Sequence, residues 1–141
     1  MEAANRGAFS AGANSIGLNI QLPSEQRTNK YVTRGRAFHY FFTRKVMLAA
    51  SAQAYVFFPG GFGTLDEFFE IVVLIQTGKM QKLPVICVGK EYWDGLVSWI
   101  NRELVERQGA VDKKEVDIFT IVDTAQEAMD IIATSSERTL F

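Results

Sequence analysis

The chain is poor in the residues that crosslink proteins or bind zinc. It has one cysteine, Cys87, and one histidine, His39, among 141 residues. A single cysteine excludes a disulfide framework within the chain, and its place in the apolar run 84–88 predicts a buried, inert thiol. Because there is no second histidine and no cysteine cluster, we expect no metal site. His39 itself is expected to be a packed or surface residue rather than a catalyst.

The chain also lacks a strong net charge and a long apolar run. Its formal net charge is −1, so no basic field favours a nucleic-acid partner. No apolar run is long enough to cross a bilayer, and residues 1–6 lack the core of a signal peptide. We therefore expect a cytoplasmic protein without a membrane partner. Phenylalanine is abundant, at 11 residues, which predicts that some aromatic surface is buried in a homodimer.

The hydrophobic pattern predicts a single α/β domain over residues 1–141. A first helix ends at Gly12, and short apolar runs then alternate with segments of helical spacing. The order β-α-β-α-β-α-β-α implies a parallel sheet with helices on its faces. We expect strands at 15–20, 54–58, 83–89 and 116–122, and helices at 36–53, 64–77, 91–107 (with Leu96, Trp99, Ile100 and Leu104 inward) and 124–133; the polar loop 24–35 includes Glu25, Gln26 and Asn29, with a short strand at 31–33.

A glycine-rich segment separates a predicted strand from a predicted helix. Residues 59–67 read Pro-Gly-Gly-Phe-Gly-Thr-Leu-Asp-Glu. Gly60, Gly61 and Gly63 let the backbone approach an anion, and the amides at a helix start point toward it along the positive end of the dipole. With Thr64 they form a candidate phosphate-binding turn. The alternative is a tight connection without a ligand, which is common in α/β folds, but so many glycines exceed what a plain connection requires.

Glu67 has two interpretations. With Thr64 it fits a capping box, in which the threonine caps the helix and the glutamate bonds back to the threonine amide. A carboxylate here would also lie beside a bound phosphate and near the ribose of a nucleotide. There it could orient a water or stabilise a cationic sugar, as carboxylates do in glycosidic cleavage. From spacing alone the capping box is favoured. Glu70, one turn later, shares the same face and either assists Glu67 or is solvated.

Arg44 and Lys45 form a dibasic pair in an aromatic-rich predicted helix. Positions 40, 41, 47, 48 and 49, one turn away, carry no acidic residue. The pair is therefore expected to meet an anion from elsewhere, such as a ligand. The alternatives are extension of both side chains to solvent and pairing with an acid distant in sequence.

Taken together, the dibasic pair and the glycine-rich segment resemble a known family. Arg44-Lys45 followed by residues 59–67 is similar to the paired signature of the Lonely Guy phosphoribohydrolases, formerly labelled lysine decarboxylases. Segments 41–47 and 74–79 and the pair Tyr92-Trp93 are most similar to bacterial members. The resemblance extends from residue 1 to about residue 122. It implies a Rossmann-like three-layer fold with a parallel sheet, a homodimer and no cofactor.

The resemblance also implies a function and assigns roles to residues. Members that activate cytokinins hydrolyse the N-glycosidic bond of nucleoside 5′-monophosphates, giving the free base and ribose 5-phosphate. By this resemblance the glycine turn with Thr64 binds the 5′-phosphate of an AMP-like substrate, Lys45 joins the binding residues, and Arg44 and Glu67 are the catalytic pair. Catalysis is thereby favoured over capping for Glu67.

The sequence differs from the family in two respects. The family carries an upstream segment, with the first strands of its sheet and a further glycine-rich loop, that this sequence lacks, so we expect an N-terminally truncated member. Phe41-Phe42 also replace the Met-His of plant members.

Two other functions stay open beside this one. One is a non-catalytic module that binds a nucleotide or phosphocofactor. The other is an amino-acid decarboxylase, which would need pyridoxal phosphate on Lys45.

Overall fold

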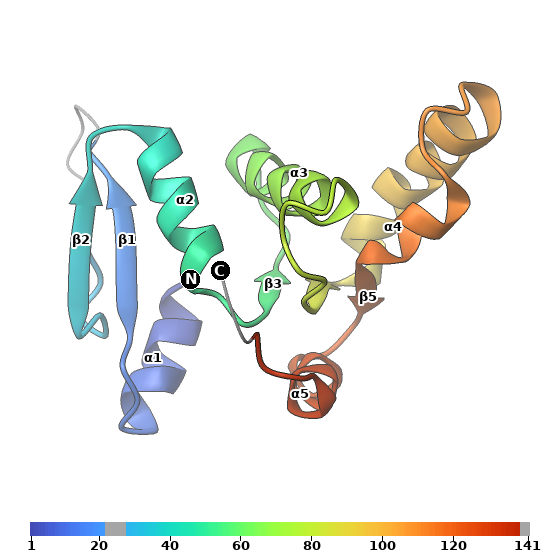
Figure 1. Ribbon diagram of the computed structural model, residues 1–141. Coiled ribbons are helices and arrows are strands. Elements are labelled where there is room, and N and C mark those ends of the chain that lie inside the picture. Colours follow the sequence, from blue (N-terminus) through green and yellow to red (C-terminus); the bar gives the residue numbers. More distant parts are fainter. Residues whose placement is uncertain (22–27, 139–141) are drawn as a thin grey trace. The chain divides into compact units, whose positions relative to one another are not determined.

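The computed structural model describes residues 1–21 and 28–138. Contacts group the chain into two compact units, Met1–Ser51 and Ala52–Phe141, which are described separately here. Each unit combines parallel strands with helices (Figure 1), so the α/β class and the parallel pairing predicted from the sequence are confirmed. The single domain over residues 1–141 stays a prediction. Glu25 and Gln26 of the predicted polar loop lie outside the described residues.

The first unit is a pair of parallel strands with two helices. β1 pairs with β2 along its whole length, with Ile16 opposite Arg34 and Ile20 opposite Phe38. α2 runs along the β1–β2 pair (Figure 1). Gly12 follows the first helix with φ +71°, a left-handed conformation that favours glycine, and this confirms the predicted helix end. The elements are α1 (Glu2–Ser10), β1 (Ile16–Ile20), β2 (Arg34–Phe38) and α2 (Phe41–Ser51).

β2 corrects the sequence prediction. Residues 34–38 were assigned to the end of a loop and the start of a helix, and a short strand was expected at 31–33. The strand instead begins at Arg34 and the helix at Phe41. The reason is that four of the five β2 residues are exposed, so the segment lacks the alternation of a half-buried strand. Its strand conformation depends on backbone pairing with β1, which is distant in sequence.

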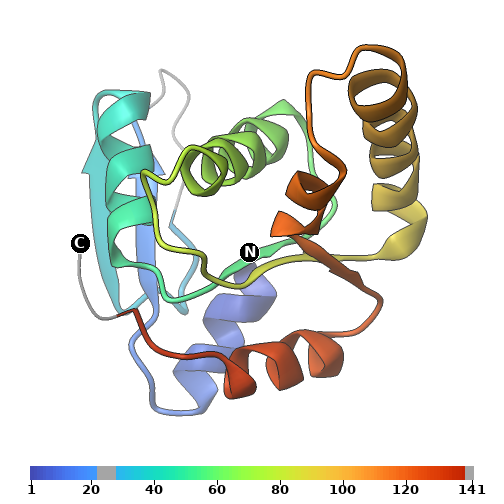
Figure 2. The ribbon, with the colours of Figure 1, turned by 45° about the vertical axis from the view of Figure 1, so that its right-hand side comes forward.

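The second unit is a three-stranded parallel sheet in the order β3-β4-β5. α3 and α5 lie on opposite faces of this sheet, as Figures 1 and 2 both show. A helix, a sheet and a helix thus form three layers. No helix in the described part of the chain has both the length and the apolar character needed to cross a membrane. The elements are β3 (Tyr55–Phe57), α3 (Phe62–Gln76), β4 (Val85–Val88), α4 (Lys90–Trp99), the π-helix η1 (Ile100–Arg107), the 3₁₀ helix η2 (Lys113–Ile118), β5 (Thr120–Val122) and α5 (Ala125–Thr134).

Side chains that alternate along the strands build a core on each face of this sheet. On one face, Ile86 and Val88 of β4 pack with Ala128 of α5. On the other, the ring of Phe68 from α3 is wholly buried against the rings of Phe57 and Trp93. Both layers are therefore fixed to the sheet by apolar contacts, and this holds the start of α3 at the carboxyl end of β3.

Two elements of the second unit differ from their predicted form. The helix expected at 91–107 is α4 continued by the π-helix η1. Ile100 is buried as expected, but Trp99 is 45% exposed, and Trp93 is the fully buried residue of α4. The strand expected at 116–122 begins only at Thr120, because a capping box between Asp112 and Glu115 starts a 3₁₀ helix ahead of it.

Candidate functional site

The glycine turn joins β3, whose Tyr55 and Phe57 are buried, to the first turn of α3. The N-cap of α3 is Gly61, and the N–H groups of Thr64 and Leu65 both donate to its carbonyl oxygen, at 3.1 and 3.2 Å. No described residue accepts a hydrogen bond from the N–H of Gly61, Phe62 or Gly63. Three amides at a helix N-terminus are thus available to an acceptor from outside, and this is the usual geometry of an anion site.

The capping box expected between Thr64 and Glu67 is wrong. α3 begins at Phe62, before Thr64, and the Thr64 N–H is already bonded to Gly61. The glycine at the N-cap makes a side-chain cap unnecessary at the threonine. The Thr64 side chain lies over Gly60 instead: a Cβ added to Gly60 would collide with the Thr64 hydroxyl and stand 2.8 Å from its Cβ. Glu67 is half-buried on α3, one turn beyond Gly63.

Gly61 and Gly63 have no such internal reason to be glycine. Gly61 has φ −101°, and neither glycine has a positive φ. A Cβ added to either would meet no described atom within 4 Å. Neither the backbone conformation nor the packing of the described residues therefore requires glycine at these two positions, and the space over both is open among the described residues.

The carboxyl ends of the neighbouring strands lie at the same edge of the sheet as the glycine turn. After β4, Gly89 donates its N–H to Val122 at 2.7 Å, and Lys90 forms an ion pair of 3.2 Å with Asp123 after β5. The Lys90 N–H also donates to the Asp123 carboxylate, and these hydrogen bonds hold the pKa of Asp123 below its usual value. The hydrogen bond between the Lys90 and Asp123 side chains raises the pKa of Lys90.

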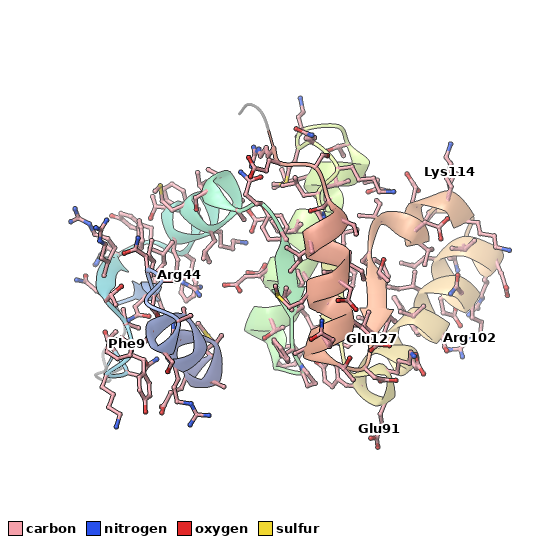
Figure 3. The ribbon with its side chains drawn as sticks, turned by 90° about the horizontal axis from the view of Figure 1, so that it is seen from below. Phe9, Arg44, Glu91, Arg102, Lys114 and Glu127 are labelled. Carbon is pink, nitrogen blue, oxygen red and sulfur yellow. The ribbon has the colours of Figure 1, made fainter. Side chains whose placement is uncertain are left out.

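The start of α5, at the same edge, is fixed by a capping box. The Thr124 hydroxyl accepts from the Glu127 N–H at 3.2 Å, and the Glu127 carboxylate accepts from the N–H groups of Asp123 and Thr124. Figure 3 labels Glu127 on α5. The backbone hydrogen bonds lower the pKa of Glu127. This carboxylate is therefore committed to the helix start.

Tyr92 also lies at this edge, and the sequence predicted no role for it. It lies in the first turn of α4, and its hydroxyl donates to the carbonyl oxygen of Gly60 at 2.8 Å. The signal in the sequence was its position, because a residue just after one parallel strand is expected to reach the loop after the next strand. Tyr92 had served only as part of the family resemblance.

Arg44 and Lys45 lie on α2 in the first unit, whereas the glycine turn, Thr64 and Glu67 lie in the second. Both basic side chains are half-buried. The Nε of Arg44, labelled in Figure 3, donates to the Leu18 carbonyl of β1 at 2.8 Å, so the guanidinium is anchored to the sheet of its own unit.

The single histidine and the single cysteine of the chain lie where the sequence predicted, one at the surface and one in the core. His39 is exposed and packs edge-on against Tyr40, which confirms a surface residue. Cys87 is fully buried in β4, and burial raises the pKa of its thiol to about 12. The thiol is therefore protonated at neutral pH, and the prediction of a buried, inert cysteine is confirmed.

The fold is that of an α/β protein with a glycine-rich turn at the carboxyl edge of a parallel sheet. A family model described as "Possible lysine decarboxylase" matches residues 1–132. The chain therefore belongs to this family, and the resemblance to the Lonely Guy proteins is confirmed by its relatives.

The relatives are phosphoribohydrolases by name. A probable cytokinin riboside 5′-monophosphate phosphoribohydrolase of Oryza sativa subsp. japonica is 31% identical over 87 residues, which cover 62% of this chain and 40% of the rice protein. The cytokinin riboside 5′-monophosphate phosphoribohydrolase of Rhodococcoides fascians is 35% identical over 68 residues, covering 48% of this chain and 34% of the relative. A second probable rice enzyme is 24% identical over 135 residues, covering 95% and 53%. The chain thus spans about half the length, or less, of these curated relatives.

Proposed function

We propose that the protein hydrolyses the N-glycosidic bond of AMP-like nucleoside 5′-monophosphates, giving the free base and ribose 5-phosphate. Family membership and the names of the relatives support this reaction class. The observation in the structure that carries it is the run of three available amides at Gly61, Phe62 and Gly63, followed one helical turn later by the carboxylate of Glu67.

The glycine turn is proposed to bind the 5′-phosphate. The available amides donate hydrogen bonds to its oxygens at the positive end of the α3 dipole. Gly60 and Thr64 shape this turn by their close contact. Lys45 is proposed as a further phosphate-binding residue, as the family resemblance implies. Hydrogen bonds from these amides and from Lys45 to a phosphate have a charged acceptor, and such bonds are stronger than those between neutral groups.

Glu67 and Arg44 are proposed as the catalytic residues. Glu67 lies four residues after Gly63 on the same face of α3, about 6 Å further along the helix axis. In the reaction water adds to C1′ as the bond to the base breaks, and the base leaves with a proton. The Glu67 carboxylate either stabilises the cationic sugar or positions the water and accepts its proton. Arg44 holds the ligand and balances its negative charge.

The proposal extends to assembly and setting. We propose a homodimer, since large aromatic side chains are exposed, including Phe41 and Phe42. A cytoplasmic setting fits a substrate of the nucleoside monophosphate class. We also propose that residues 1–141 form a single domain, within which the contacts group into two compact units.

A second candidate is a module that binds nucleotides without cleaving them. It is favoured by the available amides at the start of α3, which can bind a phosphate without taking part in bond cleavage. In this case AMP would bind but remain intact.

Incubation with AMP separates these candidates. We expect adenine and ribose 5-phosphate in equal amounts, measured by liquid chromatography, with stabilisation of the protein by AMP in a thermal shift assay. Stabilisation without adenine would favour the binding module. If AMP neither stabilised the protein nor released adenine, both candidates would be contradicted. Release of CO₂ from lysine with added pyridoxal phosphate would favour the decarboxylase instead.

Gly63→Ala tests the phosphate-binding turn. Because Gly63 is helical and a Cβ there meets no described atom, we expect the free energy of unfolding to rise by about 0.4–1 kcal/mol. The methyl group would occupy the space through which the phosphate approaches, so we expect AMP affinity to fall about tenfold or more, measured by calorimetry. Gly95→Ala on α4, also in open space, is the matched control and should leave AMP affinity unchanged. Unchanged AMP affinity in Gly63→Ala would show that the phosphate does not bind at this turn.

A further inference from the structure

Tyr92 connects α4 to the first peptide of the glycine turn through a single hydrogen bond. Its hydroxyl donates to the Gly60 carbonyl oxygen at 2.8 Å. We propose that Tyr92 is a positioning residue, which fixes the direction of the Gly61 N–H and thereby sets the affinity for the phosphate of the substrate. This inference rests on the proposed function and adds a residue to its site.

The geometry of the peptide bond carries the inference. The described residues contain no cis peptide bond, so the Gly60 carbonyl and the Gly61 N–H point in opposite directions across one planar unit. A hydroxyl that holds the carbonyl on the side of α4 therefore directs the N–H to the opposite side. The Gly61 N–H is one of the three amides for which no described residue supplies an acceptor.

A peptide between two glycines needs such a restraint. Neither Gly60 nor Gly61 has a Cβ to restrict rotation of the peptide plane, so a flipped orientation is accessible at low cost. In the flipped state the Gly60 carbonyl oxygen would face the phosphate in place of the Gly61 N–H. One donor would be lost, and one partial negative charge would be placed beside the anion. Phosphate binding is thus sensitive to this single orientation.

Tyr92 is itself held rigidly enough to act as a restraint. Its N–H donates to the Gly89 carbonyl at 3.1 Å, and its ring packs edge-on against Trp93, with centroids 5.0 Å apart. Trp93 is fully buried, and its indole N–H donates to Val88 at 3.2 Å. The hydroxyl is therefore fixed to the backbone of β4, the strand next to the one that carries the turn.

The two loops also approach each other beside this hydrogen bond. Gly89 has φ +99°, and a Cβ added there would stand 3.6 Å from Cγ of Pro59. The space between Gly89 and the residue that precedes Gly60 is thus little larger than a methyl group. With the loops this near, the Tyr92 hydroxyl sets the orientation of the Gly60 peptide.

Tyr92→Phe tests the inference, because it removes the hydroxyl and keeps the ring that packs on Trp93. We expect KM for AMP and the inhibition constant of ribose 5-phosphate each to rise about tenfold, with kcat changed less than about twofold. Tyr55→Phe is the matched control. It removes a buried hydroxyl from β3, the strand that leads into the glycine turn, and this hydroxyl donates to the Met80 sulfur at 3.4 Å. It should leave both constants unchanged.

A second measurement does not depend on the reaction. In Tyr92→Phe we expect the Gly61 amide resonance to broaden through exchange between the two peptide orientations, on the microsecond to millisecond timescale, while it stays sharp in Tyr55→Phe. A sharp Gly61 resonance in Tyr92→Phe would overturn the positioning role, whatever the substrate is. Unchanged constants in Tyr92→Phe, in a parent protein that cleaves AMP, would overturn it and leave the proposed function standing. A parent protein that neither binds nor cleaves AMP would overturn the proposed function and, with it, the link between Tyr92 and phosphate affinity.

Discussion

Replacement of Glu67 by glutamine is expected to lower kcat for AMP hydrolysis by about 10²- to 10⁴-fold, the range typical of a lost acid–base group. Glutamine keeps the size of the side chain, but it cannot accept a proton or offer a negative charge to a cationic sugar. Glu67 is half-buried on α3, one turn beyond the available amides of the glycine turn. AMP binding, measured by calorimetry, should change much less than kcat, because the phosphate-binding amides remain.

The matched control for this prediction is Glu106→Gln. Glu106 is an exposed residue of η1, so the same loss of charge should leave kcat within about twofold of the parent value. Since α3 starts at Phe62, ahead of Thr64, a fall in kcat for Glu67→Gln cannot be attributed to a lost helix cap. A Glu67→Gln protein that releases adenine at the parent rate would show that this carboxylate is not the catalyst.

The glycine turn could be predicted from the sequence because its signals are local. β3 and β4 are short and apolar, and the glycines follow β3 directly; β4 is covered on both faces as expected, whereas Val56 of β3 is exposed. Pattern and chain order together indicate a parallel sheet, and the structure confirms parallel pairing in both units. The carboxyl edge of that sheet then follows as the place for a ligand.

The parts that could not be predicted depend on contacts distant in sequence. β2 is mostly exposed, and only its pairing with β1 makes it a strand. The start of α3 was placed at Thr64 because a threonine three residues before a glutamate fits a capping box, yet Gly61 begins the helix earlier. Tyr92 acts on Gly60 across 32 residues of chain, and its role is visible only once the ends of β3 and β4 lie side by side.

Replacement of Phe68 by alanine is expected to lower the free energy of unfolding by about 3–5 kcal/mol. Phe68 is fully buried on α3, and its ring contacts those of Phe57, Trp93 and Phe119 at centroid distances of 5.5, 5.2 and 5.1 Å. Alanine would leave a cavity between the helix and the sheet that these large neighbours cannot close. A domain of this size is typically stable by about 5–15 kcal/mol, so a large share of the stability would be lost.

The same substitution at Phe62 separates burial from the loss of an aromatic ring. Phe62 begins the same helix but is 92% exposed, so Phe62→Ala should change the free energy of unfolding by less than about 0.5 kcal/mol. Both values can be read from urea titrations followed by tryptophan fluorescence, since Trp93 contacts Phe68 directly. Because Phe68 follows Glu67 and fixes α3 to β3, a destabilised Phe68→Ala protein should also lose AMP hydrolysis at urea concentrations that the parent tolerates. Equal costs at the two positions would show that the face of α3 bearing Phe68 does not hold the glycine turn against the sheet.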